Sequence, residues 1–297
     1  MKLNEYQEQS NLTDQVTDTQ RLESLMIPVL GLSGRAGALA TEYLRYLRDG
    51  SAYLAFHQRI AETLGDLLWY VSNIAHKNGL TLEGIARQNL AKTSSRWDRG
   101  IGEGICVPDF DDDFPDNERF PRVFTVEVTS AKKTDGTNTV SLSYKGNPFG
   151  DPLTDNAEKD DGYRFHDIFH LAFVSHLGWS PVLRGRLFFN CKRKSTATID
   201  EVEDGGRAAV IDEAIAALIF NEAQKNSYYE GINNVSIQLL QLISQLTAHL
   251  EVSRCTMAQW EHAILNAFEV WRLVRHHPAG RLVGSRETRR IEYDINS

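Results

Sequence analysis

Apolar residues recur at helical spacing through the first third of the chain. The pattern runs over residues 37–48, 53–78 and 81–94. Residues three and four apart share one face of an α-helix, so this spacing is typical of amphipathic helices. Asp49-Gly50 and Asn78-Gly79 interrupt the pattern, and glycine commonly follows the last residue of a helix. The sequence therefore predicts three helices here.

A different pattern follows these helices. Residues 100–120 contain several glycines and the acidic sequence PDFDDDFPDNERFP, whose prolines prevent a helix. β-branched and aromatic residues then gather in residues 123–128 and 139–144, on both sides of Thr134-Asp-Gly-Thr137, which is typical of a β-hairpin. We therefore expect two domains and an acidic linker, with boundaries at residues 1–99, 100–120 and 121–297.

Helical periodicity returns after about Gly162. It predicts four helices, followed by a short strand, over residues 163–177, 206–226, 234–252, 256–276 and 290–295. The predicted fold class is mainly α, with an N-terminal helical bundle, a β-hairpin and a larger helical C-terminal domain.

Composition narrows the class of protein. The chain has 297 residues, of which 41% are apolar, enough for an ordinary core. We expect a cytoplasmic protein without a membrane partner, because there is no uninterrupted apolar run of membrane-spanning length and the start is polar. The net charge of −8 argues against general nucleic-acid binding, which depends on basic residues. The three cysteines are widely spaced and suggest neither disulfides nor a cysteine zinc site.

The candidate chemistry lies in the C-terminal half, on two apolar helices. His166 and His170 are one helical turn apart, with Asp167 beside them, and this spacing suits two ligands of one metal ion. The second helix carries adjacent carboxylates at Asp212 and Glu213. A buried carboxylate needs a partner, so we expect these acids to meet the two histidines.

This cluster has two interpretations. In the first, His166, His170 and Glu213 hold Mg²⁺, Mn²⁺ or Zn²⁺ in a hydrolase site, with catalytic acids and phosphate-binding cations nearby. In the second, histidines and carboxylates form a buried network that fixes helix packing, and the basic residues are solvated. The predicted catalytic residues are Asp167, Glu203 and Asp204, and the predicted phosphate-binding residues are Lys192, Arg193 and Lys194.

Three N-terminal segments carry a family resemblance. They are Gly31-Leu-Ser-Gly-Arg-Ala-Gly-Ala38, Glu62-Thr-Leu-Gly-Asp-Leu-Leu-Trp-Tyr70 and Asn89 to Trp97. Together they resemble the MazG-like all-α nucleotide pyrophosphohydrolases, over about the first third of the chain. The resemblance implies Glu-x-x-Glu on one helix and Glu-x-x-Asp on the next, which gather Mg²⁺ around a nucleotide triphosphate. It also implies pairing of subunits, so we expect a homo-oligomer.

The residues at the four metal-binding positions depart from that pattern. They are Arg35, Ala38, Thr63 and Asp66, so three of the four carboxylates are absent. Glu42 and Glu62 lie nearby, either as a shifted set of ligands or as solvated charges. We expect this module to bind a nucleotide without hydrolysing it, through Arg35, Asp66, Lys92 and Arg96.

The C-terminal half carries its own resemblance. Gly150 to Asp155, the His-Asp-x-x-His motif and Glu201 to Arg207 resemble the domain found behind MazG-like modules in bacterial proteins. The resemblance implies a role in nucleotide metabolism or in anti-phage conflict. Two functions are compatible with the sequence: a metal-dependent nucleotide (pyro)phosphohydrolase acting at His166, and a non-catalytic nucleotide sensor or oligomerising scaffold.

Overall fold

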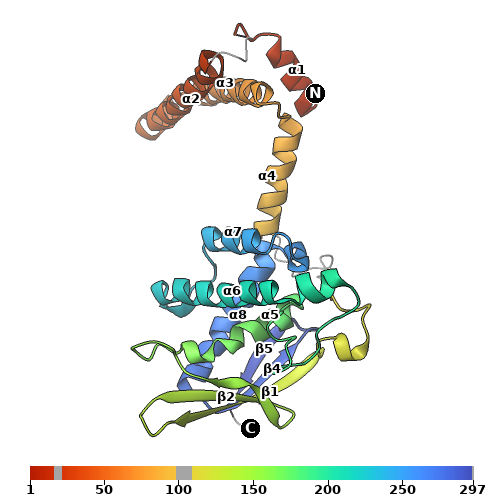
Figure 1. The fold of residues 1–297 in the computed structure, drawn as a ribbon. Coiled ribbons are helices and arrows are strands. Elements are labelled where there is room, and N and C mark those ends of the chain that lie inside the picture. The colour runs from red at the N-terminus through yellow and green to blue at the C-terminus, as the bar shows by residue number, and fades with distance from the viewer. Residues whose placement is uncertain (17–21, 98–108, 296–297) are drawn as a thin grey trace. The chain divides into compact units, whose positions relative to one another are not determined.

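The structure divides into two compact units. It is a computed structural model that describes residues 1–16, 22–97 and 109–295. Unit 1 comprises Met1–Ser94 and unit 2 comprises Ser95–Ser297 (Figure 1). The expected domain boundaries at residues 99 and 121 remain a prediction, and each unit is described by itself.

Unit 1 is built from helices. α2 and α3 are joined by a short 3₁₀ turn and pack side by side, and α1 packs on α3. Gly31 lies so close to α3 that a Cβ atom there would be 2.3 Å from the Tyr70 ring. The absence of a side chain at Gly31 therefore allows α2 and α3 to approach at this point. The helices are α1 (Leu3–Asn11), α2 (Leu22–Asp49), α3 (Phe56–Lys77) and α4 (Leu82–Trp97).

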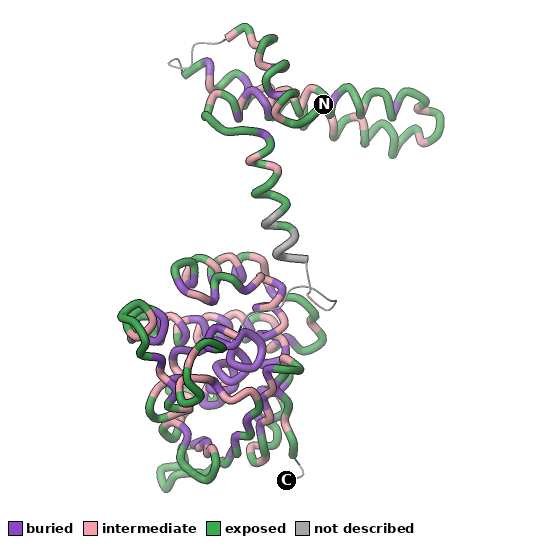
Figure 2. The backbone as a smooth tube through the Cα atoms, turned by 90° about the vertical axis from the view of Figure 1, so that its right-hand side faces the viewer, coloured by how far each residue is buried: buried purple, intermediate pink, exposed green. Residues whose placement is uncertain are grey.

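Helix α2 is both long and apolar. By length and composition, Leu22–Ala52 is long and apolar enough to cross a membrane, and an 18-residue window within it has a mean hydropathy of 1.2. Only 11% of that apolar window is buried within the structure, and Figure 2 shows this helical hairpin as largely exposed. Helices from protein interiors and from interfaces have the same composition. The cytoplasmic location expected from the sequence remains a prediction.

Unit 2 contains a five-stranded antiparallel sheet with the order β3-β2-β1-β4-β5. The expected hairpin forms its β1–β2 pair, in which Val128 faces Leu142. β4, at the C-terminal end of the chain, pairs with β1 and places Leu282 opposite Val126. The mainly α fold class with a β-hairpin is confirmed, although the sheet is larger than expected. The strands are β1 (Val123–Lys132), β2 (Asn138–Tyr144), β3 (Asn147–Leu153), β4 (Gly280–Ser285) and β5 (Arg290–Asp294).

One face of the sheet is covered by helices. Along β1, Phe124, Val126 and Val128 are buried and alternate with exposed residues, as expected for a sheet with one face in the core. α5 and α8 pack on this face, and α6 and α7 lie beyond them (Figure 1). This layer places α5 at the centre of unit 2. The helices are α5 (Asp167–Leu177), α6 (Gly206–Lys225), α7 (Ile237–Leu246) and α8 (Met257–His276).

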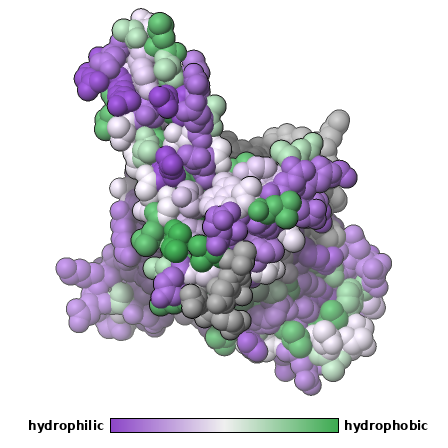
Figure 3. Space-filling model, turned by 90° about the horizontal axis from the view of Figure 1, so that it is seen from above, coloured by the Kyte–Doolittle hydropathy of each residue, from purple (hydrophilic) through white to green (hydrophobic). Residues whose placement is uncertain are grey.

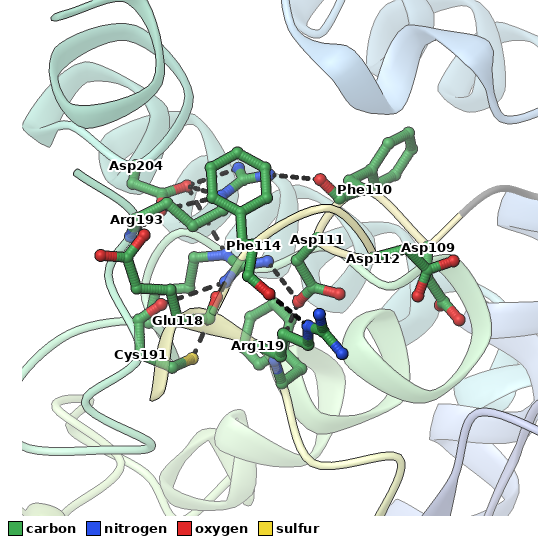
Figure 4. A network of polar contacts seen from close by, with 12 residues as sticks. Asp109, Phe110, Asp111, Asp112, Phe114, Glu118, Arg119, Cys191, Arg193 and Asp204 are labelled. Carbon is green, nitrogen blue, oxygen red and sulfur yellow. Dashed lines mark hydrogen bonds and ion pairs between the residues drawn. The ribbon is translucent and has the colours of Figure 1, made fainter. Parts of the chain in front are cut away.

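The part of the acidic segment that the structure describes packs into unit 2. Phe110 and Phe120 belong to its hydrophobic core. Asp111 accepts a hydrogen bond from Nη2 of Arg184 at 2.9 Å, and both side chains are buried (Figure 4). The guanidinium and a further ion pair with Arg122 outweigh burial and hold the pKa of Asp111 below its usual value. Residues 109–120 thus contribute core contacts as well as connecting the chain.

Candidate functional site

Helix α5 is almost completely enclosed. Every residue from Asp167 to Leu177 is buried, and the helix ends at Gly178, whose φ of 68° is readily adopted by glycine. A 3₁₀ turn at Tyr163–Phe165 precedes the helix. Polar side chains at its first turn are therefore held by protein neighbours rather than by bulk water.

His170 is oriented by a carboxylate from α6. Its Nδ1 lies 2.8 Å from Oδ1 of Asp212. The other oxygen of Asp212 accepts hydrogen bonds from the Ser180 hydroxyl and the Val182 amide. Because Asp212 is an acceptor, Nδ1 of His170 donates to it, and Nε2 is the ring nitrogen left to coordinate an ion when it is unprotonated. Nε2 is buried and has no hydrogen-bond partner among the described residues.

His166 is oriented in the same sense by the backbone. Its Nδ1 lies 3.0 Å from the carbonyl oxygen of Tyr163, so it donates a proton there. Its ring stacks on the Tyr163 ring with centroids 4.5 Å apart. Both histidines therefore present Nε2 for coordination, and histidine ligands of metals are commonly fixed through the other ring nitrogen in this way.

Glu213 completes the cluster. Its Oε2 lies 3.4 Å from Nε2 of His170 and 3.9 Å from Nε2 of His166. One ligand atom of each residue lies within 4.8 Å of the others, a spacing that can hold a metal ion. The Glu213 side chain is 46% exposed, so the cluster is open to solvent on this side. Three protein ligands with an open side are typical of catalytic rather than structural sites.

The electrostatics of the cluster favour a positive charge at its centre. Burial opposes protonation of His170, but Asp212 and Glu213 outweigh it and raise its pKa well above the usual value. The contact with His170 in turn lowers the pKa of Glu213. A divalent cation between Nε2 of His170 and Oε2 of Glu213 would balance the negative charge of the two carboxylates, as a proton on His170 does in its absence.

Asp167 is a second carboxylate near Nε2 of His166. Its Oδ1 is 3.8 Å from Nε2 of His166, so the structure brings this predicted residue to the edge of the cluster. Burial raises the pKa of Asp167, and the two histidines only partly offset it. Gly150 leaves room here, since a Cβ atom there would lie 3.7 Å from Oδ2 of Asp167 and closer still to Phe188.

The other predicted catalytic acids are bonded elsewhere. Oε2 of Glu203 accepts the backbone amide of Glu251 at 2.9 Å. Asp204 accepts hydrogen bonds from the buried guanidinium of Arg193 (Figure 4). Their catalytic roles remain predictions, but the hydrogen bonds of both acids serve a separate ionic network.

The predicted phosphate-binding run has three different environments. Lys192 forms an ion pair with Asp200 at 2.6 Å. Arg193 is 0% exposed, whereas Lys194 is exposed. Of the three side chains, only those of Lys192 and Lys194 reach the surface where they can meet phosphate.

In unit 1, the two charged residues at the expected metal-binding positions meet each other. Nε of Arg35 lies 3.2 Å from Oδ2 of Asp66, between α2 and α3. Thr63 donates its hydroxyl to the backbone of α3. The helices thus bring these positions together, with an ion pair where the resemblance implies a cation. The side chains of Lys92 and Arg96 lie outside the described part of the chain.

Tyr163 and Ser180 are functional residues that sequence reasoning missed. Tyr163 supplies a carbonyl and a stacking ring to His166, and Ser180 holds the carboxylate that orients His170. Tyr163 acts locally, three residues before His166, whereas Ser180 acts across 32 residues of sequence on Asp212. The only sequence signal was the presence of a carboxylate on an apolar helix, which pointed to Asp212 but not to its remaining partners.

The second histidine of α5, His176 near its C-terminal end, leads to a prediction about pH. Burial lowers the pKa of His176 to about 4, against about 6.5 in an unfolded chain. Between these pH values the native state therefore binds fewer protons than the unfolded chain. The contribution of His176 to the free energy of unfolding is complete above about pH 6.5 and is lost as the pH falls towards 4. We expect this residue to account for about 2 kcal/mol of lost stability between pH 7 and pH 5.

His176→Gln tests this expectation. Nε2 of His176 lies 2.8 Å from Oδ1 of Asn266, and glutamine keeps an N–H donor but does not titrate. Urea unfolding at pH 7 and pH 5 should show a smaller loss of stability for the variant than for the native protein. His276→Gln, at an exposed position, serves as the control. Equal losses in the native protein and His176→Gln would contradict the prediction.

Comparisons with known proteins add a family and a phage relative. The profile of the MazG C-terminal domain matches residues 105–297. The Gene 37 protein of Mycobacterium phage L5 is 34% identical over 89 residues, which cover 29% of this chain and 78% of the phage protein. No solved structure matches the chain significantly.

Proposed function

Because the chain belongs to the MazG C-terminal domain family, we propose that it is a metal-dependent hydrolase of phosphorylated nucleotides, acting at the His166 cluster. One observation carries the proposal. Two imidazole Nε2 atoms and one Glu213 oxygen converge within 4.8 Å, while both Nδ1 atoms are bonded elsewhere. This arrangement leaves the coordinating atoms available in the correct tautomer.

The ligand set favours some metals over others. Two imidazole nitrogens and one carboxylate suit Zn²⁺ or Mn²⁺ better than Mg²⁺, which prefers oxygen ligands. His166, His170 and Glu213 would hold the ion, and the open side at Glu213 would admit the substrate. Such an ion polarises phosphate oxygens and activates water. Asp167 is placed to hold a proton beside His166, or to serve as a further ligand.

A nucleotide panel tests this function directly. Protein purified without added metal should contain near-stoichiometric divalent metal, and it should hydrolyse at least one nucleoside phosphate when supplied with Mn²⁺, Zn²⁺ or Mg²⁺. Resolving the products identifies the base and the bond that is cleaved. Absence of bound metal, together with no hydrolysis and no metal-dependent shift in thermal stability, would refute the proposal.

Unit 1 favours a second, compatible role as an oligomerising scaffold. Its helical hairpin exposes large apolar side chains, and Leu44 and Leu47 are 65% and 79% exposed. Figure 3 shows hydrophobic residues at the surface among hydrophilic ones. An apolar surface of this kind is typical of an interface, and a second copy of this chain is the partner that the resemblance implies. Light scattering across a dilution series should show a dimer or larger species, and a monomer at all concentrations would exclude this role.

The Arg35–Asp66 ion pair yields a prediction about hydrolysis. We expect Arg35→Ala and Asp66→Ala to keep the rate of any nucleotide hydrolysis within about twofold of the native rate. The proposed chemistry lies at the His166 cluster, and an exposed ion pair contributes little to the stability of unit 1. Steady-state rates on the nucleotide cleaved by the native protein measure this. A loss of about a hundredfold or more, the scale of a catalytic group, would instead place chemistry in unit 1.

A further inference from the structure

A cavity lies in unit 2, apart from the His166 cluster. Its volume is about 690 Å³, within the range of small-molecule sites. Its walls come from α8, from the segment after Tyr229 and from the turn between β4 and β5. None of the four residues of the His166 cluster and its edge lines it. His176, at the far end of α5, does, so the helix separates the two places.

The charge of this cavity is opposite to that of the chain. Arg272, Arg289 and Arg290 line it together with a single acid, Glu269. Arg290 forms an ion pair with Glu269 at 3.5 Å. Arg272 donates to the carbonyl of Tyr228, and neither Arg272 nor Arg289 has a carboxylate partner among the described residues. In a protein with a net charge of −8, two guanidinium groups that no carboxylate neutralises in one cavity favour an anionic ligand.

The neutral part of the lining can recognise a nucleobase. Gln259 uses its Oε1 to cap α8 at the Thr256 amide, which leaves its Nε2 donors available. His262 on α8 and Asn233 in the segment after Tyr229 supply further donors and acceptors to the lining. Asn266 is held between His176 and the backbone amide of Ile291. Fixed polar groups beside an anion site are the means by which pockets read one ligand among many.

Tyr229 adds an independent observation. Its side chain lines the cavity and is 3% exposed, yet its hydroxyl has no hydrogen-bond partner among the described residues. Ser227, Tyr228 and Tyr229 have φ values of 50°, 51° and 58°, a left-handed conformation that is unfavourable for such residues. Backbone strain and orphaned buried donors both gather at ligand sites.

From these features we propose that the cavity is a second binding site, which takes a nucleoside phosphate without a metal ion. Arg272 and Arg289 bind the phosphate groups, and Gln259 and Asn233 contact the base. The site goes beyond the hydrolase function and does not depend on it. The residues for this ligand come from α8, from the segment after Tyr229 and from the β4–β5 turn, whereas the proposed metal ligands lie at the start of α5 and on α6.

Isothermal titration of the full chain in EDTA tests the proposal. The probes are ribonucleoside and deoxyribonucleoside mono- and triphosphates, with uncharged nucleosides and inorganic phosphate for comparison. At least one nucleotide should bind, and more tightly than either its nucleoside or phosphate. Arg289→Ala and Arg272→Gln, which keeps a donor for the Tyr228 carbonyl, should each weaken binding about tenfold, the scale of a lost charge-assisted hydrogen bond.

Two matched variants separate the sites. Arg281→Ala removes the same charge from the exposed surface of β4 and should leave nucleotide affinity unchanged. His166→Ala/His170→Ala should also bind nucleotide normally in EDTA, whether or not the native protein is a hydrolase. The proposal is overturned if no nucleotide binds in EDTA, if the histidine variant loses that binding, or if the two arginine variants keep it. Equal binding of nucleotide and inorganic phosphate would equally overturn it.

Discussion

The His166→Ala/His170→Ala variant is expected to lose its bound divalent metal and, with it, nucleotide hydrolysis. Both Nε2 atoms that converge on Glu213 are removed, and a lone half-exposed carboxylate binds such ions weakly. We expect hydrolysis to fall by about a hundredfold or more, because a metal site activates water that is otherwise unreactive at neutral pH. Elemental analysis of protein purified without chelator, alongside rates on the cleaved nucleotide, measures both effects.

Asp212→Asn makes the test of the metal site sharper. The asparagine amide can donate to Nδ1 of His170 where the carboxylate of Asp212 accepted, and this would move the imidazole proton to Nε2 and block coordination. Metal affinity should fall by about 10- to 100-fold, the scale seen when such an orienting partner is lost. A buried network without metal would show no change in metal content.

His276→Ala controls for general effects of removing a histidine, since His276 is exposed at the end of α8. It should retain native metal content and activity. Circular dichroism and thermal melts of all variants establish that loss of metal is not loss of fold. If the double histidine variant, still folded, kept full metal and full activity, the cluster would be structural.

Helices were more predictable than strands, for a physical reason. The apolar spacing of residues 206–226 and 256–276 reports one buried face per helix, and α6 and α8 form there. β3 contains Pro148 and Pro152, which argue against a strand unless it lies at a sheet edge, where β3 is found. β4 contains two glycines, and Gly284 is needed because the Phe124 ring lies over it.

The histidine cluster was visible from the sequence because its spacing is local. His166 and His170 share one face of one helical turn, so their proximity follows from helix geometry. The choice of partner was not local: Asp212 lies 42 residues from His170. Only the tertiary structure decides which of two adjacent acids orients the histidine and which one joins it as a ligand.

The environment of the basic residues 192–194 was also not predictable from the local sequence. Its sequence is typical of a solvated or phosphate-binding surface, but the fold buries Arg193 completely. The guanidinium donates to Asp204 and to the carbonyl of Phe110 (Figure 4). It also donates to Glu251. Burial raises the pKa of Glu251, and Arg193 opposes this increase. Arg193 thus joins three distant segments of unit 2.

Arg193→Ala is therefore expected to destabilise unit 2 by about 3–5 kcal/mol, the cost of leaving buried carboxylates without their cation. Arg193→Lys should recover part of this loss, because an ammonium keeps the charge but not the planar fork that reaches several acceptors. Lys194→Ala, at the exposed neighbour, should change stability by no more than about 0.5 kcal/mol. Urea unfolding followed by tryptophan fluorescence reports on unit 2 through buried Trp179, Trp260 and Trp271.

The order of the stability losses in these three variants distinguishes a buried ionic network from a surface contact. If Arg193 acted on phosphate at the surface, Arg193→Ala and Lys194→Ala would have similar, small effects on stability, and both would weaken nucleotide binding. A buried ionic network instead requires a large loss of stability in Arg193→Ala, an intermediate loss in Arg193→Lys and almost none in Lys194→Ala. A loss below about 1 kcal/mol in Arg193→Ala, the range of an exposed ion pair, would show that the network contributes no more than a surface contact.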